Sequence, residues 1–238
     1  MLVKKRFYAV IHVEDFERAS VNAAYAYENG ADGIFLINHS LSCEDLLEIY
    51  HDVRKKYPDQ WIGLNFLGPD AARAMQMLPA DADGLWTDNA EIDEDGPNII
   101  PGQWYADFKK THPRSSYFGG VAFKYQRHVE NLECAAKEAQ LCMDVICSSG
   151  AGTGIAANVD HVRRLASGKG DRPLALASGV TPENIDTFLP YADCFLVATG
   201  VSRSFRMLDP KKVKLLAEKI RAYNEKMLSG NRCAPESN

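Results

Sequence analysis

Eight short apolar runs, separated by segments with helical periodicity, constrain this chain more than any other feature of its sequence. The runs recur roughly every 20 to 35 residues, and each is too short to form a helix. They span residues 7–13, 33–37, 61–67, 84–87, 117–123, 144–147, 174–177 and 194–198. Most are continuously apolar rather than alternating, which is typical of parallel strands buried on both faces. The runs therefore predict eight parallel strands.

The segments between the runs carry signals for helix starts and for turns. Ser42, Thr181 and Asp209 each place a capping oxygen ahead of an expected helix, and proline follows the last two. An alanine-aspartate pair directly precedes three of the runs and predicts a helix-to-strand turn. These pairs are Ala31-Asp32, Ala82-Asp83 and Ala192-Asp193. Eight strand-helix units close a barrel, whereas an open doubly wound sheet, the alternative, leaves two runs unused.

The length of the chain agrees with one domain of this kind. Its 238 residues, 46% of them hydrophobic, lie near the size of a single barrel, which is roughly 250 residues. We therefore expect an α/β fold: a single (β/α)₈ TIM barrel over residues 1–228, followed by a disordered tail over residues 229–238.

Charge, hydropathy and cysteine usage exclude several classes of partner. The net charge of -5 gives no basic surface for a nucleic acid. No stretch approaches the roughly 20 apolar residues that a membrane span requires. The six cysteines include no Cys-x-x-Cys pair, so we expect reduced thiols in a cytoplasmic protein. The sequence leaves a homo-oligomer open.

Polar residues stand where the predicted strands end, and in TIM barrels the chemistry lies at that end of the strands. Any one of these residues could be a satisfied polar group at a strand terminus, but the set together favours a site. Asn38 and His39 both follow the run 33–37. The candidate catalytic residues are His12, Asn38, Asn65, Asp88 and Lys124.

Each candidate suits a particular role. Lys124 could act as the electrophile, either as a Schiff-base amine or as a cation that stabilises oxyanion charge. His12 could exchange protons near neutral pH, and Asp88 could be a second acid or base or a metal ligand. Asn38 and Asn65 could orient hydroxyl groups. Strand alternation predicts that Lys124 faces the barrel axis. The sequence predicts no cofactor and leaves a divalent metal open.

Glycine-rich turns follow the last three runs, where phosphate-binding barrels hold their phosphate. Glycine lets backbone N–H groups approach the phosphate oxygens, so a side chain at Gly179 or Gly200 is expected to block the ligand while leaving the core intact. Glycine also simply makes tight turns, which is the alternative explanation. The phosphate-binding candidates are Gly150, Gly152, Ser178, Gly179, Thr199 and Gly200.

Five stretches of the chain resemble motifs of the BtpA/SgcQ family, a TIM-barrel group, and they run from the first strand to the last turns. The stretches are 10–13 (VIHV), 63–67 (GLNFL), 122–124 (AFK), 149–154 (SGAGTG) and 178–184 (SGVTPEN). The resemblance implies a phosphate-binding barrel. Relatives of this length suggest phosphoribosyl-type chemistry.

Two hypotheses of different classes follow. The first is an enzyme that acts on a small phosphorylated metabolite, such as a sugar or ribose phosphate, by isomerisation, carbon–carbon or N-glycosidic bond chemistry. The second is a non-catalytic, BtpA-like assembly or ligand-binding protein. Thermal stabilisation by sugar phosphates would show whether the site binds such ligands.

Overall fold

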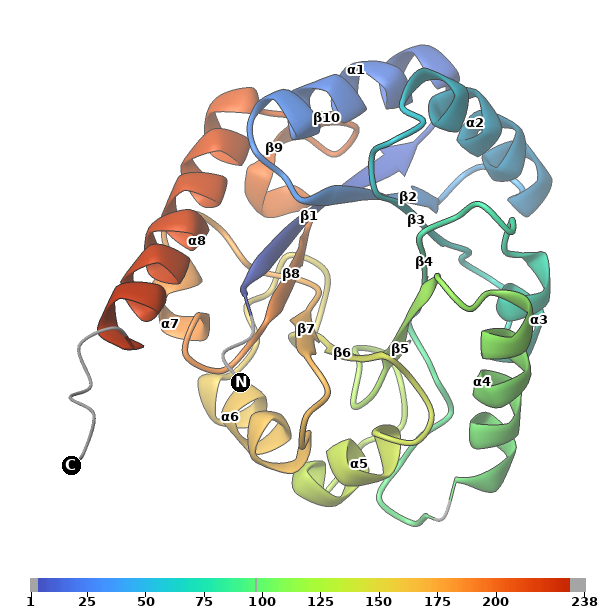
Figure 1. Ribbon diagram of the computed structural model, residues 1–238, viewed down its shortest axis with the longest axis vertical. Helices are drawn as coiled ribbons and strands as arrows, with labels where there is room; N and C mark the ends of the chain where they lie inside the picture. The colour runs from blue at the N-terminus through green and yellow to red at the C-terminus, as the bar shows by residue number, and fades with distance from the viewer. Residues whose placement is uncertain (1–3, 97, 232–238) are drawn as a thin grey trace.

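The computed structural model describes residues 4–96 and 98–231 and shows a closed barrel of eight parallel strands surrounded by helices (Figure 1). The strands follow one another around the barrel in chain order, from β1 to β8. The predicted single (β/α)₈ barrel is therefore confirmed. No helix in the described part of the chain is long and apolar enough to cross a membrane.

Each of the eight apolar runs forms a strand of the barrel. The strands are β1 (Arg6–Val13), β2 (Gly33–Asn38), β3 (Ile62–Asn65), β4 (Gly84–Thr87), β5 (Ser116–Gly120), β6 (Val145–Ser148), β7 (Leu174–Leu176) and β8 (Cys194–Val197). The helices are α1 (Phe16–Glu28), α2 (Cys43–Lys56), α3 (Ala71–Met77), α4 (Ile99–Thr111), α5 (Leu132–Ala139), α6 (Val159–Gly168), α7 (Ile185–Phe188) and α8 (Pro210–Asn231). A 3₁₀ turn, η1 (Thr199–Val201), and a hairpin of β9 (Ser202–Ser204) and β10 (Met207–Leu208) lie between β8 and α8.

The predicted capping residues begin two of the helices. Ser42 and Asp45 form a reciprocal capping box at the start of α2. Asp209 accepts a hydrogen bond from the amide of Lys211 at the start of α8. Thr181 instead accepts from Glu183 within a turn, and α7 begins only at Ile185.

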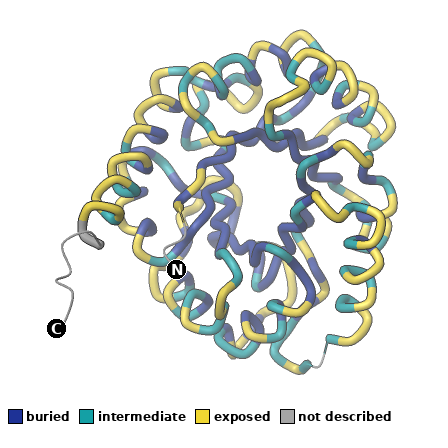
Figure 2. Tube along the Cα trace, viewed as in Figure 1, coloured by how far each residue is buried: buried dark blue, intermediate teal, exposed yellow. Residues whose placement is uncertain are grey.

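Hydrophobic side chains fill both faces of the strands, and burial is greatest along the strand ring (Figure 2). The inner face carries aromatic side chains, among them Tyr8, Phe35 and Phe118. Phe35 and Phe118 meet edge to face with ring centres 5.2 Å apart, a favourable geometry for aromatic pairs. The outer face packs against the helices. The barrel is therefore closed by its own side chains below the level of the strand ends.

Aspartates at the N-terminal end of the barrel, which we call the floor, tie neighbouring strands together. The three predicted Ala-Asp turns are present, and Asp144 makes a fourth. Asp193 is typical: its N–H donates to Leu174 O (2.7 Å), and its carboxylate accepts from Leu174 N (3.0 Å). Each of these aspartates directly precedes one strand and accepts a hydrogen bond from an amide near the start of the strand before it. The floor aspartates are Asp32, Asp83, Asp144 and Asp193, and the amides are those of Phe7, Ile62, Tyr117 and Leu174.

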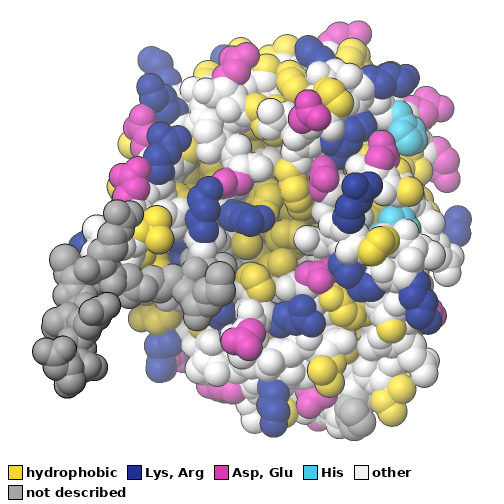
Figure 3. Space-filling view, viewed as in Figure 1, with side chains coloured by type: hydrophobic (Ala, Val, Ile, Leu, Met, Phe, Trp, Pro, Cys, Tyr) yellow, Lys and Arg dark blue, Asp and Glu magenta, His cyan; other side chains and the backbone are white. Residues whose placement is uncertain are grey.

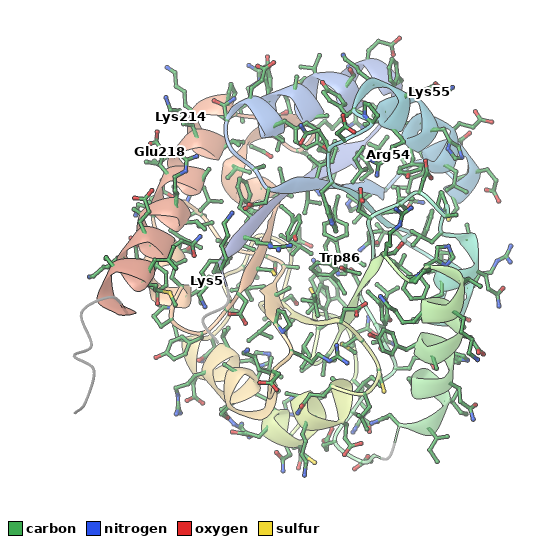
Figure 4. All side chains as sticks on the ribbon, viewed as in Figure 1. Lys5, Arg54, Lys55, Trp86, Lys214 and Glu218 are labelled. Carbon is green, nitrogen blue, oxygen red and sulfur yellow. The ribbon has the colours of Figure 1, made fainter. Side chains whose placement is uncertain are left out.

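Every floor aspartate also contacts a cation. The most buried case is Asp193, with Lys5 at 3.0 Å and Lys169 at 3.1 Å. Figure 4 labels Lys5 and Arg54 on the face that carries this end of the barrel. In the same view, Figure 3 shows hydrophobic side chains at the centre of the face with Lys, Arg, Asp and Glu around them. The charges of the four floor aspartates are thus paired with Lys or Arg side chains.

Two predicted boundaries differ from the structure. The run 117–123 ends as a strand at Gly120, because Ala122 has a left-handed backbone with φ of 48° that no regular strand accommodates. Helix α8 continues to Asn231, so the first three residues of the expected tail are helical. The rest of that tail, residues 232–238, lies outside the described residues.

Candidate active site

A cavity of about 240 Å³ opens at the C-terminal end of the barrel, which we call the mouth. Its apolar base is formed by inner-face side chains such as Val10, Ile37 and Leu196. Its wall is polar and comes from the ends of the strands and the loops that follow them. The wall residues are His12, His39, Asp88, Lys124, Tyr125, Thr153, Gly154, Ser178, Gly179, Thr199 and Gly200. The cavity is the size of a small metabolite, below the range of about 300–1,000 Å³ for drug-sized ligands.

The structure brings three of the five catalytic candidates, His12, Asp88 and Lys124, to this one cavity. Asn65 lies buried beside Asp88, and its Nδ2 donates to Asp88 Oδ1 at 3.1 Å. Asn38 does not reach the cavity. The polar cluster at this end of the barrel therefore consists of His12, Asn65, Asp88 and Lys124.

His12 stands at the end of β1 in a defined tautomer. Its Nδ1 lies 2.9 Å from Phe205 O, and a carbonyl oxygen only accepts, so Nδ1 carries the proton and Nε2 keeps its lone pair. Burial, together with the neighbouring His39 and Lys124, lowers the pKa of His12 to about 4. At neutral pH His12 is therefore an uncharged imidazole whose Nε2 can accept a proton.

Phe205 comes from the β9–β10 hairpin, which the sequence did not predict. Its ring packs against the His12 ring at a tilt of 38°, with centres 4.1 Å apart, and is half exposed. Asn22 of α1 holds the hairpin, because its side chain donates to Arg206 O and accepts from Leu208 N. Arg206 also pairs with Glu14. The hairpin thus fixes the orientation of His12.

Asp88 follows β4 and carries an altered acidity. Burial raises the pKa of its carboxyl group, and the hydrogen bond from Asn65 and the charge of Lys124 oppose that rise. A carboxyl with a raised pKa can hold a proton closer to neutral pH than an ordinary aspartate.

Lys124 reaches the mouth for a different reason from the one predicted. The alternation argument is wrong, because Lys124 lies beyond the end of β5, and Phe123 rather than Ala122 belongs to the inner cluster. Ala122 (φ 48°) and Tyr125 (φ 63°) both have left-handed backbones and bracket Lys124. The Lys124 amide donates to Ser149 Oγ at 2.8 Å. A strained loop anchored on β6 therefore presents this lysine.

The Lys124 ammonium is unpaired within the described part of the chain. No carboxylate there lies within 4.0 Å of its Nζ, and its nearest aromatic partner is the Phe123 ring, at 5.3 Å from the centroid. A cation held at a cavity wall without a counter-ion is free to bind an anionic or electron-rich ligand oxygen.

Asn38 has a structural position, which corrects its predicted role. It lies on the outer-facing side of β2 because its neighbour Ile37 faces the inner cluster. Its side chain accepts from Leu67 N (2.8 Å) and donates to Leu41 O (3.0 Å). His39, one position later, lines the cavity instead. Counting strand parity from Ile37 would have selected His39.

The turns after β7 and β8 meet at one side of the mouth. Ser178, Gly179, Thr199 and Gly200 all line the cavity. No acceptor among the described residues takes the amide protons of Gly179 and Gly200. These N–H groups are available to an anion.

The reason for glycine at these positions differs from the predicted one. A Cβ at Gly179 would lie 2.3 Å from the backbone of Ala156, and one at Gly200 would lie 1.8 Å from Val180 O. A side chain at either position would therefore collide with the protein itself. Substituting these glycines would disturb the loops whether or not a ligand binds.

The two glycines predicted to bind phosphate in the loop after β6 do not reach the cavity, unlike those after β7 and β8. Gly150 and Gly152 do not line the cavity; a Cβ at Gly150 would collide with Ile155 O. Gly154 lines it instead, with φ of 75° and open space toward Thr199 Oγ1. Of the three glycines in the Gly-x-Gly-x-Gly stretch, only the last one lines the cavity.

Metal-binding clusters and disulfides are lacking among the residues that the structure describes. No group of three or more His, Cys, Asp or Glu residues is arranged to hold a metal ion in residues 4–96 and 98–231. Within the same ranges, the five cysteines are free thiols, and Cys233 lies outside them.

Comparison with known proteins places the chain by its fold. No protein-family model matches it, and no curated protein sequence matches it. Phosphoribosyl anthranilate isomerase from Thermus thermophilus aligns at a TM-score of 0.63 and 16% identity, over 91% of this chain and 98% of that chain. A geranylgeranylglyceryl phosphate synthase from Thermoplasma acidophilum, in complex with sn-glycerol-1-phosphate, aligns at 0.67 and 15%, over 92% and 94%.

Thiamine phosphate pyrophosphorylase from Pyrococcus furiosus aligns at a TM-score of 0.61 and 17% identity, over 92% of this chain and 97% of that chain. The chain is thus a TIM barrel with a distant structural resemblance to these enzymes. At such low identity the likeness shows the fold alone. The resemblance to the BtpA/SgcQ family rests on the sequence motifs.

Proposed function

We propose that this protein is an enzyme that acts on a small phosphorylated metabolite of the sugar-phosphate or ribose-phosphate class. One observation carries the proposal: a single small cavity combines the unbonded amides of Gly179 and Gly200, an unpaired Lys124 ammonium and a neutral His12. The position also supports it, because TIM-barrel enzymes carry their sites at this end and often hold phosphate after strands 7 and 8.

The phosphate would lie against the turns after β7 and β8. The amides of Gly179 and Gly200 would donate to its oxygens, as in other backbone anion sites, and the hydroxyl of Thr199 stands beside them. Three barrels of the same fold are named for phosphorylated molecules: phosphoribosyl anthranilate, thiamine phosphate and geranylgeranylglyceryl phosphate. Those names support the same ligand class here.

The remaining wall residues suit proton transfer next to a carbonyl or glycosidic carbon. His12 Nε2 would accept a proton from the substrate, and Lys124 would stabilise the negative charge that develops on the substrate oxygen. Asp88, with its raised pKa, would return a proton. Isomerisation, carbon–carbon cleavage and N-glycosidic cleavage all use these steps, and borohydride trapping would detect a Schiff base on Lys124.

Replacement of Thr199 by glutamate tests the phosphate site. Thr199 is exposed at the cavity wall, so Thr199→Glu places a negative charge beside the amides with little effect on folding. Thermal shift and calorimetry with inorganic phosphate and ribose 5-phosphate should show binding to the unmodified protein and to Thr199→Gln, and a loss of tenfold or more in Thr199→Glu. Equal affinities for both variants would contradict the assignment.

Measurement of turnover distinguishes an enzyme from a non-catalytic ligand-binding protein. Phosphorylated sugars that bind should be converted, and conversion should require His12 and Lys124. Binding without conversion of any bound compound would favour the second class, a non-catalytic ligand-binding or assembly protein of the BtpA/SgcQ type.

A further inference from the structure

Two buried polar atoms inside the barrel have no hydrogen-bond partner in the described part of the chain: Asn65 Oδ1 and Trp86 Nε1. Asn65 is fully buried and Trp86 is 5% exposed. An unpaired donor or acceptor in such a place destabilises the folded state, because it has lost its hydrogen bonds to water without gaining others. Native proteins leave few of them, and such atoms often mark the place of an unseen partner.

The two atoms belong to neighbouring side chains on the same face of the sheet. Asn65 of β3 and Trp86 of β4 are register partners. Trp86 belongs to the inner cluster and lines the mouth cavity, and Figure 4 shows it within the strand ring. Asn65 is tied by its Nδ2 to Asp88, which lines the same cavity. Trp86 therefore lies at the base of the proposed site, and Asn65 lies next to it, buried beside Asp88.

The pair consists of one donor and one acceptor, which restricts what it can bind. The indole N–H only donates, and the amide oxygen only accepts. A partner for both must accept one hydrogen bond and donate another. A carboxylate has no proton to give and an ammonium has no lone pair, whereas a hydroxyl group meets both requirements.

We propose that Asn65 and Trp86 form a hydroxyl-binding subsite, in which one hydroxyl oxygen accepts from Trp86 Nε1 and donates to Asn65 Oδ1. The inference deepens the proposed function, on which it rests for the phosphate. In the closed order from β1 to β8, the β3–β4 pair lies across the barrel from the β7–β8 pair. The ligand would therefore span the mouth, with its phosphate on one side and a hydroxyl on the other, as a phosphorylated polyol or sugar can.

The Trp86 indole N–H reports on this subsite directly. The chain has three tryptophans, so a ¹H–¹⁵N spectrum holds three indole resonances, and Trp86→Phe identifies the one from Trp86. Glycerol 3-phosphate and ribose 5-phosphate should shift this resonance. Propyl phosphate, which lacks free hydroxyls, and inorganic phosphate should leave it in place while shifting the amides of Gly179 and Gly200.

Affinity provides the second readout. Trp86→Phe removes the indole N–H together with part of the ring, whereas Asn65→Leu keeps the side-chain size but removes both Oδ1 and the bond from Nδ2 to Asp88. The affinity for propyl phosphate is the control for these additional changes. Each variant should weaken the binding of glycerol 3-phosphate about tenfold and leave the affinity for propyl phosphate unchanged. A merely structural role would weaken both ligands equally and would overturn the proposal.

The outcomes separate this inference from the proposed function. If phosphates shift the amides of Gly179 and Gly200 but no hydroxylated compound moves the Trp86 resonance, the subsite is overturned and the phosphate site stands. If ribose or glycerol moves the indole resonance while no phosphate moves the amides, the subsite stands and the phosphate site fails. If no compound moves the resonance and Trp86→Phe lowers stability, a buried water occupies the place, and the subsite is overturned.

Discussion

The two ends of the barrel differ in whether their polar groups have hydrogen-bond or ion-pair partners. Each of the four floor aspartates binds a backbone amide and at least one Lys or Arg side chain. At the mouth, the Lys124 ammonium, the amides of Gly179 and Gly200, and the buried atoms of Asn65 and Trp86 have no partner in the described residues. Satisfied polar groups hold the fold together, whereas unsatisfied ones at a cavity are available to a ligand. Floor substitutions should therefore change stability, and mouth substitutions should change binding.

The largest expected effect is at the floor, in Asp193→Asn. The change keeps an acceptor for Leu174 N but leaves two cations without their carboxylate: Lys5, whose side chain is 7% exposed, and Lys169. Breaking a buried pair in this way costs about 3–5 kcal/mol, which urea unfolding would measure.

Asp32→Asn is the matched control for that change. Asp32 makes the same backbone bond, to Phe7 N, but its cation Lys4 is 69% exposed. The cost should be below about 1 kcal/mol. Equal losses in the two variants would show that burial of the cation does not distinguish the floor sites.

At the mouth, Lys124→Met should weaken ribose 5-phosphate binding by about tenfold to a hundredfold, because a charge-assisted hydrogen bond is lost. The unfolding free energy should change little, since Lys124 has no carboxylate partner to lose. Calorimetry and urea unfolding together test both halves of the statement. The control is Lys110→Met, because Lys110 is an exposed lysine paired with Asp107. A similar loss of affinity in this control would contradict the assignment of Lys124 to the binding site.

The pH dependence of stability should also distinguish the two ends. His12 titrates near 6.5 when unfolded but has a folded pKa of about 4, so the unfolded state binds more protons between these values. Stability contributed by the neutral imidazole is thus present above pH 6.5 and lost as pH falls toward 4, by about 2 kcal/mol after allowance for partial solvent exposure.

Asp193 at the floor loses its contribution to stability at a lower pH than His12 does. Burial alone would raise the pKa of Asp193, but its bonds to Leu174 N and Lys5 lower it, so its contribution is lost only as pH falls below the usual aspartate range. His12→Gln should flatten the dependence between pH 6.5 and 4 and leave the more acidic part unchanged. An unchanged profile in His12→Gln would show that His12 is not held neutral.

The smallest expected effect concerns Asn38. It lies near the mouth, but its side chain is hydrogen-bonded to the backbone, as the floor aspartates are. Asn38→Ala leaves Leu67 N without its acceptor and should cost about 1 kcal/mol of stability. Binding of ribose 5-phosphate should be unchanged. A large loss of affinity with unchanged stability would show that Asn38 takes part in binding after all.

The fold was predictable from the sequence because the barrel depends on local, repeated signals. Continuous apolar runs such as 84–87 and 194–198 encode strands buried on both faces, and the Ala-Asp pairs mark the floor turns. The fourth floor turn was missed because Asp144 follows methionine rather than alanine. The end of β5 was missed because the left-handed backbone at Ala122 has no residue signature; alanine rarely adopts it.

The site was predictable only in part. His12 stands at the end of β1, and Asp88 and Lys124 follow β4 and β5, so their level in the barrel could be inferred from strand ends alone. Their partners depend on contacts distant in sequence: Phe205 fixes the His12 tautomer from a hairpin 193 residues later. The unpaired state of Trp86 Nε1 depends on every neighbour around it, and no pattern in the sequence carries that information.

Amide chemical shifts on titration with inorganic phosphate test the central claim most directly, because they locate the anion residue by residue. The account predicts that the amides of Gly179 and Gly200 shift most, and that resonances around the floor stay in place. The floor has its own hollow of about 940 Å³, whose charged lining residues are Arg54, Lys55, Arg114, Asp81 and Asp83. Shifts confined to that hollow, with none at Gly179 and Gly200, would contradict the account.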